Sequence, residues 1–155
     1  MTDRPPLLHR ADLPWRVLLV LGLVFLVVSG TDLAMLWLPG RLGVPEWEYG
    51  TSSAFFDSFP MFGIGLLLLG AGARALGYRW LELTVIVLAV LTAVFMWLVA
   101  ALYATVAPLV FKMAHDPVAL TPLKKAAVKT AVQAVVYPLA LLWLAAGVLR
   151  RPRRL

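Results

Sequence analysis

Two charged residues, the acid Asp32 and the base Lys129, could do chemistry inside a membrane. Asp32 lies in the apolar run from Trp15 to Leu38, and Lys129 lies in the run from Pro122 to Leu149. A charged side chain that faces lipid is costly, so such groups usually turn inward, where they pair or mark a route for protons or ions. Asp32 and Lys129 are therefore a candidate ion pair near the outer leaflet, with Lys129 as the counter-ion.

Further polar residues occur in the same apolar runs. Lys125, Lys129 and Gln133 recur at intervals of four, which places them on one face of a helix. Tyr103 and Tyr137 carry hydroxyls that need a partner when they are buried. The sequence thus predicts an intramembrane polar cluster formed by Asp32, Tyr103, Lys125, Lys129, Gln133 and Tyr137.

A purely structural role is the alternative for these groups. Lysines can extend to the headgroups, and Asp32 can hydrogen-bond locally with Ser29 or Thr31 or be protonated. Asp57 and Ser58 are interpreted as N-cap residues of the next helix. Breaking a buried pair costs more than losing a cap, so Asp32→Asn is predicted to destabilise the protein more than Asp57→Asn.

The remaining reactive residues do not predict an active site. The chain has no cysteine, which excludes thiol catalysis and thiolate metal sites. His115 and Asp116 are adjacent in a segment that we interpret as a turn, and both histidines, His9 and His115, lie outside the apolar runs. The weakest hypothesis is a membrane enzyme that acts on a lipid or quinone, with these candidate residues: Glu46, Glu48, Asp57 and His115. We expect no catalytic residue, no metal and no cofactor.

The composition is that of a membrane protein. Hydrophobic residues make up 62% of the chain and charged residues 14%, against roughly 45–50% and 25% in soluble domains. The net charge of +6 comes from basic residues at the ends of apolar runs, where they act as topology signals rather than as a nucleic-acid site. We expect one transmembrane domain over residues 1–155, and no nucleic-acid partner.

Four apolar segments approach or exceed the roughly 20 residues that a helix needs to cross a bilayer. The predicted spans are residues 15–38, 58–76, 80–107 and 122–149. They predict an all-α, integral membrane four-helix bundle with short loops. Two alternatives remain: the first span as a cleaved signal peptide, and a second helix that begins at Thr51 and is kinked at Pro60.

The second span contains small residues at intervals of seven, namely Gly63 with Gly70 and Gly65 with Gly72. Such a face lets neighbouring helix backbones approach closely. Helix packing is the preferred interpretation, and a narrow pathway is the alternative.

The distribution of arginine and lysine predicts the orientation. With four spans, both termini lie on one side together with nine basic residues, and five lie on the other. The second group is Arg41, Lys112, Lys124, Lys125 and Lys129. This bias favours cytoplasmic termini, and the arginine-, leucine- and alanine-rich composition is typical of a bacterial protein, so we expect the plasma (inner) membrane.

Short loops and the lack of a catalytic motif favour an accessory or interaction subunit of a membrane complex. Its expected partners are the lipid bilayer and either further copies of itself or other membrane-protein subunits. The alternative is a small oligomeric transporter or channel for protons or cations that uses Asp32 with Lys129 as counter-ion.

Overall fold

The chain is all-α in its computed structural model, which describes residues 12–38, 40–114 and 117–150, without the side chains of 117–119 and 148–150. Its helices are α2 (Leu13–Met35), α3 (Pro45–Ala75), α4 (Arg79–Met113) and α5 (Pro117–Arg150). Each of the four contains a segment that is long and apolar enough to cross a membrane. This agrees with a multi-pass membrane protein.

Helices α3 and α4 are longer than the sequence predicts. α3 begins at Pro45 rather than at residue 58, so Asp57 and Ser58 lie in the middle of the helix and their interpretation as caps was wrong. Proline in the first turn and the acids Glu46 and Glu48 favour a helix start at this position. α4 likewise continues through Pro108 to Met113. Prolines inside membrane helices are tolerated because neighbouring groups satisfy the freed backbone.

The short connections α2–α3 and α3–α4 each contain a glycine with a positive φ angle. Gly43, between α2 and α3, has a φ angle of 90°, and Gly77, between α3 and α4, has a φ angle of 71°. Residues with a Cβ rarely adopt this left-handed conformation. The Gly43 N–H donates a hydrogen bond of 2.8 Å to Glu48 Oε1 in the first turn of α3, so the α2–α3 loop is joined to the helix that follows it.

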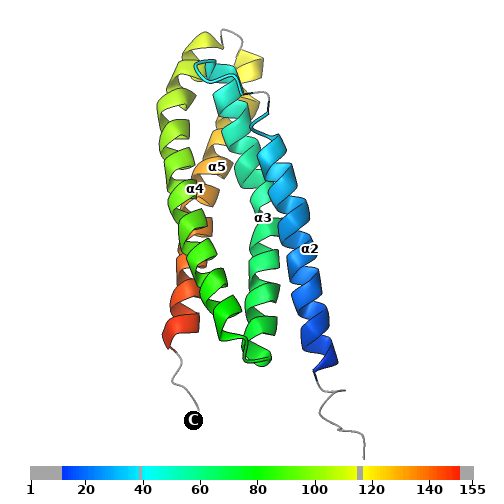
Figure 1. The fold of residues 1–155 in the computed structure, drawn as a ribbon. Helices are drawn as coiled ribbons and strands as arrows, with labels where there is room; N and C mark the ends of the chain where they lie inside the picture. Colours follow the sequence, from blue (N-terminus) through cyan, green and yellow to red (C-terminus); the bar gives the residue numbers. More distant parts are fainter. Residues whose placement is uncertain (1–11, 39, 115–116, 151–155) are drawn as a thin grey trace, which may run out of the picture.

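α3 is the central helix of the arrangement (Figure 1). It packs closely against α2 and α4 and more lightly against α5, while α4 packs closely against α5. Among the described residues, the backbone of α2 closely approaches only that of α3. Helices α3, α4 and α5 therefore enclose a common core, and α2 lies against the outside of α3, while the predicted four-helix bundle stays a prediction.

Glycines allow the close approach of α2 and α3. A Cβ on Gly22 of α2 would lie 2.6 Å from the Leu69 backbone nitrogen, and one on Gly65 of α3 would lie 3.1 Å from the Gly22 carbonyl oxygen. A Cβ on Gly72 would lie 2.9 Å from the Trp15 carbonyl oxygen. Small residues at these positions therefore bring the two backbones into direct contact.

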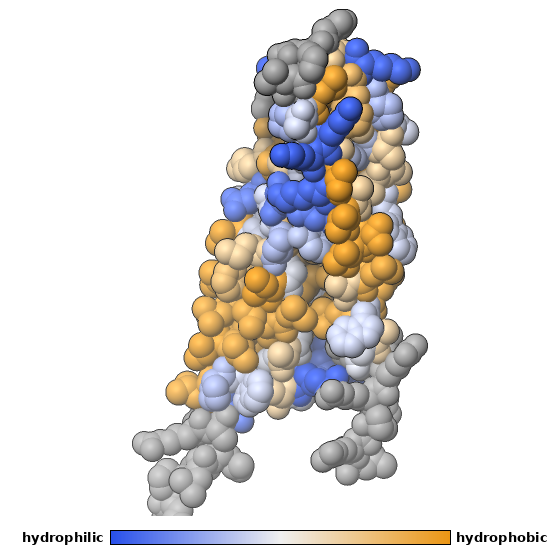
Figure 2. Space-filling model, turned by 180° about the vertical axis from the view of Figure 1, so that it is seen from behind, coloured by the Kyte–Doolittle hydropathy of each residue, from blue (hydrophilic) through white to orange (hydrophobic). Residues whose placement is uncertain are grey.

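The two ends of the molecule differ in the chain segments and the basic residues that they contain. α2 starts and α5 finishes at the same end, together with the α3–α4 turn (Figure 1). We call this the termini end, and it carries Arg16, Arg74 and Arg79. The opposite end, here the loop end, holds the α2–α3 loop and the connection from α4 to α5. Seen from behind, the lower half of the molecule is mostly apolar and hydrophilic residues gather in the upper half (Figure 2).

Candidate functional site

Asp57 lies at the centre of a polar network between α3 and α5. Its Oδ1 atom lies 2.7 Å from Lys129 Nζ and accepts a hydrogen bond of 3.2 Å from Gln133 Nε2. The same Gln133 nitrogen donates to the Tyr137 hydroxyl at 3.2 Å. The side chains of Lys129 and Asp57 are 59% and 43% exposed. The ion pair is thus open to the side of the molecule, whereas Gln133 Oε1 is buried and has no hydrogen-bond partner among the described residues.

The network is the lowest of three polar contacts that join α3 to α5. Nearer the loop end, Ser53 Oγ and Thr130 Oγ1 lie 3.1 Å apart, and either atom can donate the hydrogen bond. Nearer still, the Tyr49 hydroxyl donates to the Leu123 carbonyl oxygen at 2.7 Å. We call these three contacts the polar ladder. Its α3 members, Tyr49, Ser53 and Asp57, recur every four residues, which places them on one face of the helix.

A buried pair of tyrosines extends the ladder to α4. The rings of Tyr49 and Tyr103 are stacked with centroids 5.0 Å apart. The Tyr103 hydroxyl and Ser52 Oγ are both buried without a hydrogen-bond partner among the described residues. Polar groups without partners are rare in protein interiors, so the loop half of the α3–α4–α5 core is unusually polar for a membrane helix group.

The predicted pairing of Asp32 with Lys129 does not form. Asp32 is exposed and has neither an ion pair nor a side-chain hydrogen bond with the described residues, and Lys129 pairs with Asp57 instead. The physical reason is that α2 lies on the far side of α3 and has no close approach to α5. Lys125 is also exposed and stands one turn above the network.

The residues of the predicted intramembrane polar cluster therefore do not all lie together. Lys129, Gln133 and Tyr137 come together around Asp57, Tyr103 lies among the buried tyrosines, and Asp32 and Lys125 stand apart. Sequence reasoning named Asp57 only as a cap and as a candidate of the enzyme hypothesis, and it did not place Ser53, Tyr49 or Thr130 in a polar site. The four-residue spacing of the α3 members was a visible signal, but it has meaning only when α3 is recognised as helical from Pro45 onward.

The depth of the network follows from helix geometry. Asp57 lies about 17 residues before Arg74, or roughly 26 Å of helix, and Lys129 lies about 21 residues before the end of α5, or roughly 32 Å. The hydrocarbon core of a bilayer is about 30 Å thick. A membrane whose lower boundary coincides with the arginines of the termini end therefore has its upper boundary near the Asp57–Lys129 pair.

An apolar groove begins directly below the network, and we call it the α3–α5 groove. Its volume is about 310 Å³. Tyr137 lines its upper end, and the walls include Phe59, Gly63, Ile64, Leu67, Leu141 and Trp143. The rings of Phe59 and Tyr137 lie 5.5 Å apart across the two helices. The groove thus passes from a polar mouth at the network into an apolar region nearer the termini end.

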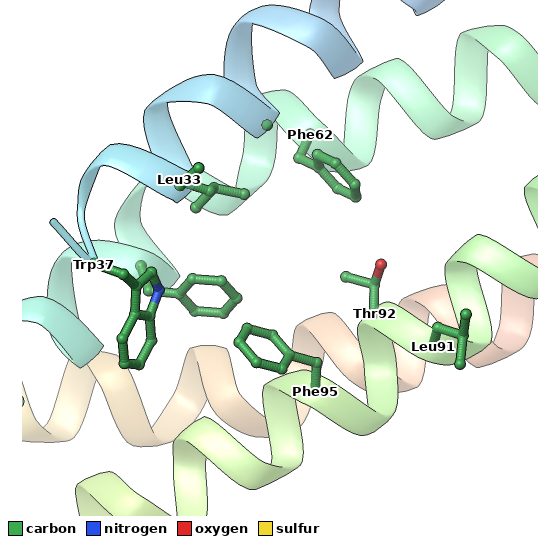
Figure 3. Close-up of a pocket in the computed structure, with 9 residues that line it drawn as sticks. Leu33, Trp37, Phe62, Leu91, Thr92 and Phe95 are labelled. Atoms are coloured by element: carbon green, nitrogen blue, oxygen red, sulfur yellow. The ribbon is translucent and has the colours of Figure 1, made fainter. Parts of the chain in front are cut away.

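A second groove, the α2–α4 groove, lies where α2 and α4 face each other across α3 (Figure 3). Its volume is about 390 Å³, and its walls include Gly30, Ala34, Trp37, Phe62, Leu91 and Phe95. The ring of Trp37 is in edge contact with Phe95, with centroids 6.3 Å apart, and with Trp47, at 6.0 Å. The α2 side of the groove thus combines the small residues Gly30 and Ala34 with Leu33 and the following Trp37, and the other side is formed by residues of α3 and α4.

Gly30 faces open space in this groove. No described residue lies within 4 Å of the position that its Cβ would occupy, in contrast to Gly22 two turns earlier. Among the glycines predicted to pack helices, Gly65 and Gly72 face α2 and Gly63 lines the α3–α5 groove. A Cβ on Gly70 would lie 3.4 Å from Val85 Cγ1 of α4.

Some predicted features lie outside the described part of the chain. These are His9, His115 and Asp116 and the basic residues before residue 12 and after residue 150. Among the described residues, no group of three or more histidine and acidic side chains is placed to hold a metal ion. The chemistry that this site offers is ion pairing and hydrogen bonding at the mouth of an apolar groove.

Comparison of the chain with protein-family models, with curated proteins and with solved structures found no match.

Proposed function

We propose that this chain is an accessory subunit of a membrane complex and that it binds one transmembrane helix of another membrane protein in the α2–α4 groove. The observation that carries this proposal is the groove itself, with Gly30 and Ala34 of α2 on one wall and Phe62 of α3 and Phe95 of α4 on the other. The groove remains open because, among the described residues, the backbone of α2 closely approaches only that of α3.

The physics of helix association in lipid supports a helix as the occupant. Hydrophobic burial gives little driving force between helices in a bilayer, so association depends on close packing at small residues. Gly30 and Ala34 are four residues apart and lie on one face of α2. Gly22 already serves the contact with α3, whereas the position beside Gly30 is empty. A helix that packs against Gly30 and Ala34 would also contact the aromatic wall.

The transporter hypothesis is not carried forward. It required Lys129 as the counter-ion of Asp32 in a shared interior, and Lys129 is instead paired with Asp57 at the side of the molecule.

We also propose that both termini are cytoplasmic and that the membrane is a bacterial plasma membrane. Arg16, Arg74 and Arg79 at the termini end support this orientation, because positively charged loops and flanks are retained in the cytoplasm. The lysines of the loop end lie largely on α5, where they belong to the helix rather than to a short loop.

The test is affinity purification of the tagged protein from its native membrane in mild detergent, with quantitative mass spectrometry. Wild type is expected to retain one membrane protein at a fixed stoichiometry. Gly30→Leu, which fills the α2–α4 groove, is expected to lose it. Gly63→Leu is the matched control, because it places the same side chain in the other groove. Equal recovery of the partner with wild type and Gly30→Leu, or recovery of this chain alone, would contradict the proposal.

A further inference from the structure

We infer that the α3–α5 groove and the polar network at its mouth bind one glycerophospholipid, with the phosphodiester at Lys129 and one acyl chain along the groove. This site is separate from the α2–α4 groove of the proposed function, and it uses residues of α3 and α5 only.

The apolar part of the site fits an acyl chain. From its mouth the groove follows α3 from Phe59 to Leu67 and α5 from Tyr137 to Trp143 and Leu144, toward the termini end. Its volume of about 310 Å³ lies at the lower end of the range for ligand pockets. These residues lie below the boundary set by the Asp57–Lys129 pair, so the groove opens into the hydrocarbon layer, where acyl chains are the surrounding solvent.

The charged part of the site fits a phosphate. An ammonium group carries three N–H donors, and Asp57 is the one acceptor that Lys129 has among the described residues. The other donors of this half-exposed side chain remain available at headgroup depth. Lys125 stands one turn above on the same face of α5. Lys125, Lys129 and Asp57 together carry one net positive charge, which favours an anionic group at this point.

Tyr137 belongs to both the charged part and the apolar part of the proposed lipid site. Its hydroxyl oxygen accepts a hydrogen bond from Gln133, and its own hydrogen has no acceptor among the described residues. The same side chain lines the groove. A phenolic O–H at the junction between headgroup and acyl depth is placed to donate to an ester carbonyl oxygen of the lipid, because tyrosine commonly bridges polar and apolar layers.

The test is native mass spectrometry of the full chain extracted in mild detergent, with the bound phospholipid identified by dissociation. Wild type is expected to retain one phospholipid. Gly63→Leu fills the groove without a backbone clash, because its Cβ would meet only Phe59 Cε1, at 3.5 Å. Lys129→Gln removes the charge that binds the phosphate. Each variant is expected to lower lipid occupancy about tenfold, the loss expected for one charge-assisted hydrogen bond or a blocked chain site.

Two controls separate this site from general effects. Gly30→Leu fills the other groove and Lys124→Gln removes a lysine that lies outside the network, so both are expected to retain the lipid. Lys129→Gln also leaves Asp57 without its partner, so thermal unfolding is recorded for every variant, and Gly63→Leu, which keeps the ion pair, decides the result. Wild-type occupancy in folded Gly63→Leu, or no retained lipid in wild type, would overturn the inference.

Discussion

At the scale of single residues, the polar network depends on one carboxylate oxygen. Asp57 Oδ1 receives both the Lys129 ammonium group and the Gln133 amide. An ion pair with both partners substantially exposed contributes about 0–1 kcal/mol in water, and the adjacent hydrogen bond to a charged group adds to it. The contribution is larger at a membrane boundary, where apolar residues such as Phe59 lower the local dielectric constant.

Asp57→Asn is expected to lower stability by about 1 kcal/mol, because the amide keeps the shape of the carboxylate but loses the charge that pairs with Lys129. For a chain of this length that corresponds to a fall of about 2–4 °C in Tm. Asp32→Asn is the matched control and is expected to leave Tm unchanged, since Asp32 has no partner among the described residues. Thermal unfolding in detergent checks both, and a larger fall for Asp32→Asn would contradict the network.

The sequence alone predicts that Asp32→Asn destabilises the protein more than Asp57→Asn, and the structure reverses this order. The reason is geometric. Asp32 and Asp57 both lie roughly 25 Å of helix from the arginines of the termini end, so depth in the membrane does not distinguish them as partners of Lys129. The choice depends on which helix lies next to α5. Helix order around a bundle is set by packing at many positions, and hydropathy in a single sequence contains no information on it.

At the scale of helices, the α2–α3 contact depends on Gly22. A Cβ at this position would lie 2.6 Å from the Leu69 backbone nitrogen and 2.9 Å from the Gly65 carbonyl oxygen. Both obstacles belong to the backbone and cannot turn aside as a flexible side chain can. The helices must therefore separate if the residue is enlarged.

Gly22→Ala is expected to destabilise the protein by about 1–3 kcal/mol, the range for overpacking at a tight contact. Gly147→Ala is the matched control: no described residue lies near its Cβ position, and alanine in place of glycine stabilises a helix by up to about 1 kcal/mol. Thermal unfolding of the two variants provides the comparison. Equal Tm values for Gly22→Ala and wild type would show that the backbones are further apart than described.

The sequence prediction placed the start of α3 too late in the chain. The segment from Pro45 to Asp57 is rich in acidic, hydroxyl and aromatic residues, so hydropathy alone places it in a loop and starts the helix near residue 58. The start signals at Pro45, Glu46 and Glu48 were present in the sequence. They indicate a helix that extends beyond the apolar span, and this extension carries the α3 members of all three contacts of the polar ladder.

At the scale of the whole molecule, the four spans were predicted from apolar length, and the structure has four helices of the required length and hydropathy. Composition is sufficient for this result because each bilayer crossing needs a helix of fixed minimum length. The two grooves could not be predicted. They exist because, in the described part of the chain, the backbone of α2 closely approaches only that of α3, and because α3 and α5 approach each other lightly. Both facts concern distances between helices.

The orientation of the molecule is tested with single cysteines in a chain that has none of its own. Leu42→Cys lies in the exposed α2–α3 loop and avoids the strained position Gly43. It is expected to react with an impermeant thiol reagent on intact cells. Tyr78→Cys, in the turn at the termini end, is expected to react only after lysis. The opposite labelling pattern would place the termini outside.

The most direct test of the proposed function is photocrosslinking from the α2–α4 groove in native membranes. A photoreactive amino acid at Ala34, which lines the groove, is compared with one at Val24, which is 51% exposed on the same helix and lies outside the groove. The account predicts that Ala34 crosslinks to one membrane protein, that Gly30→Leu abolishes this product, and that Val24 yields only lipid adducts. Lipid adducts alone at Ala34, or a crosslink to a second copy of this chain, would contradict it.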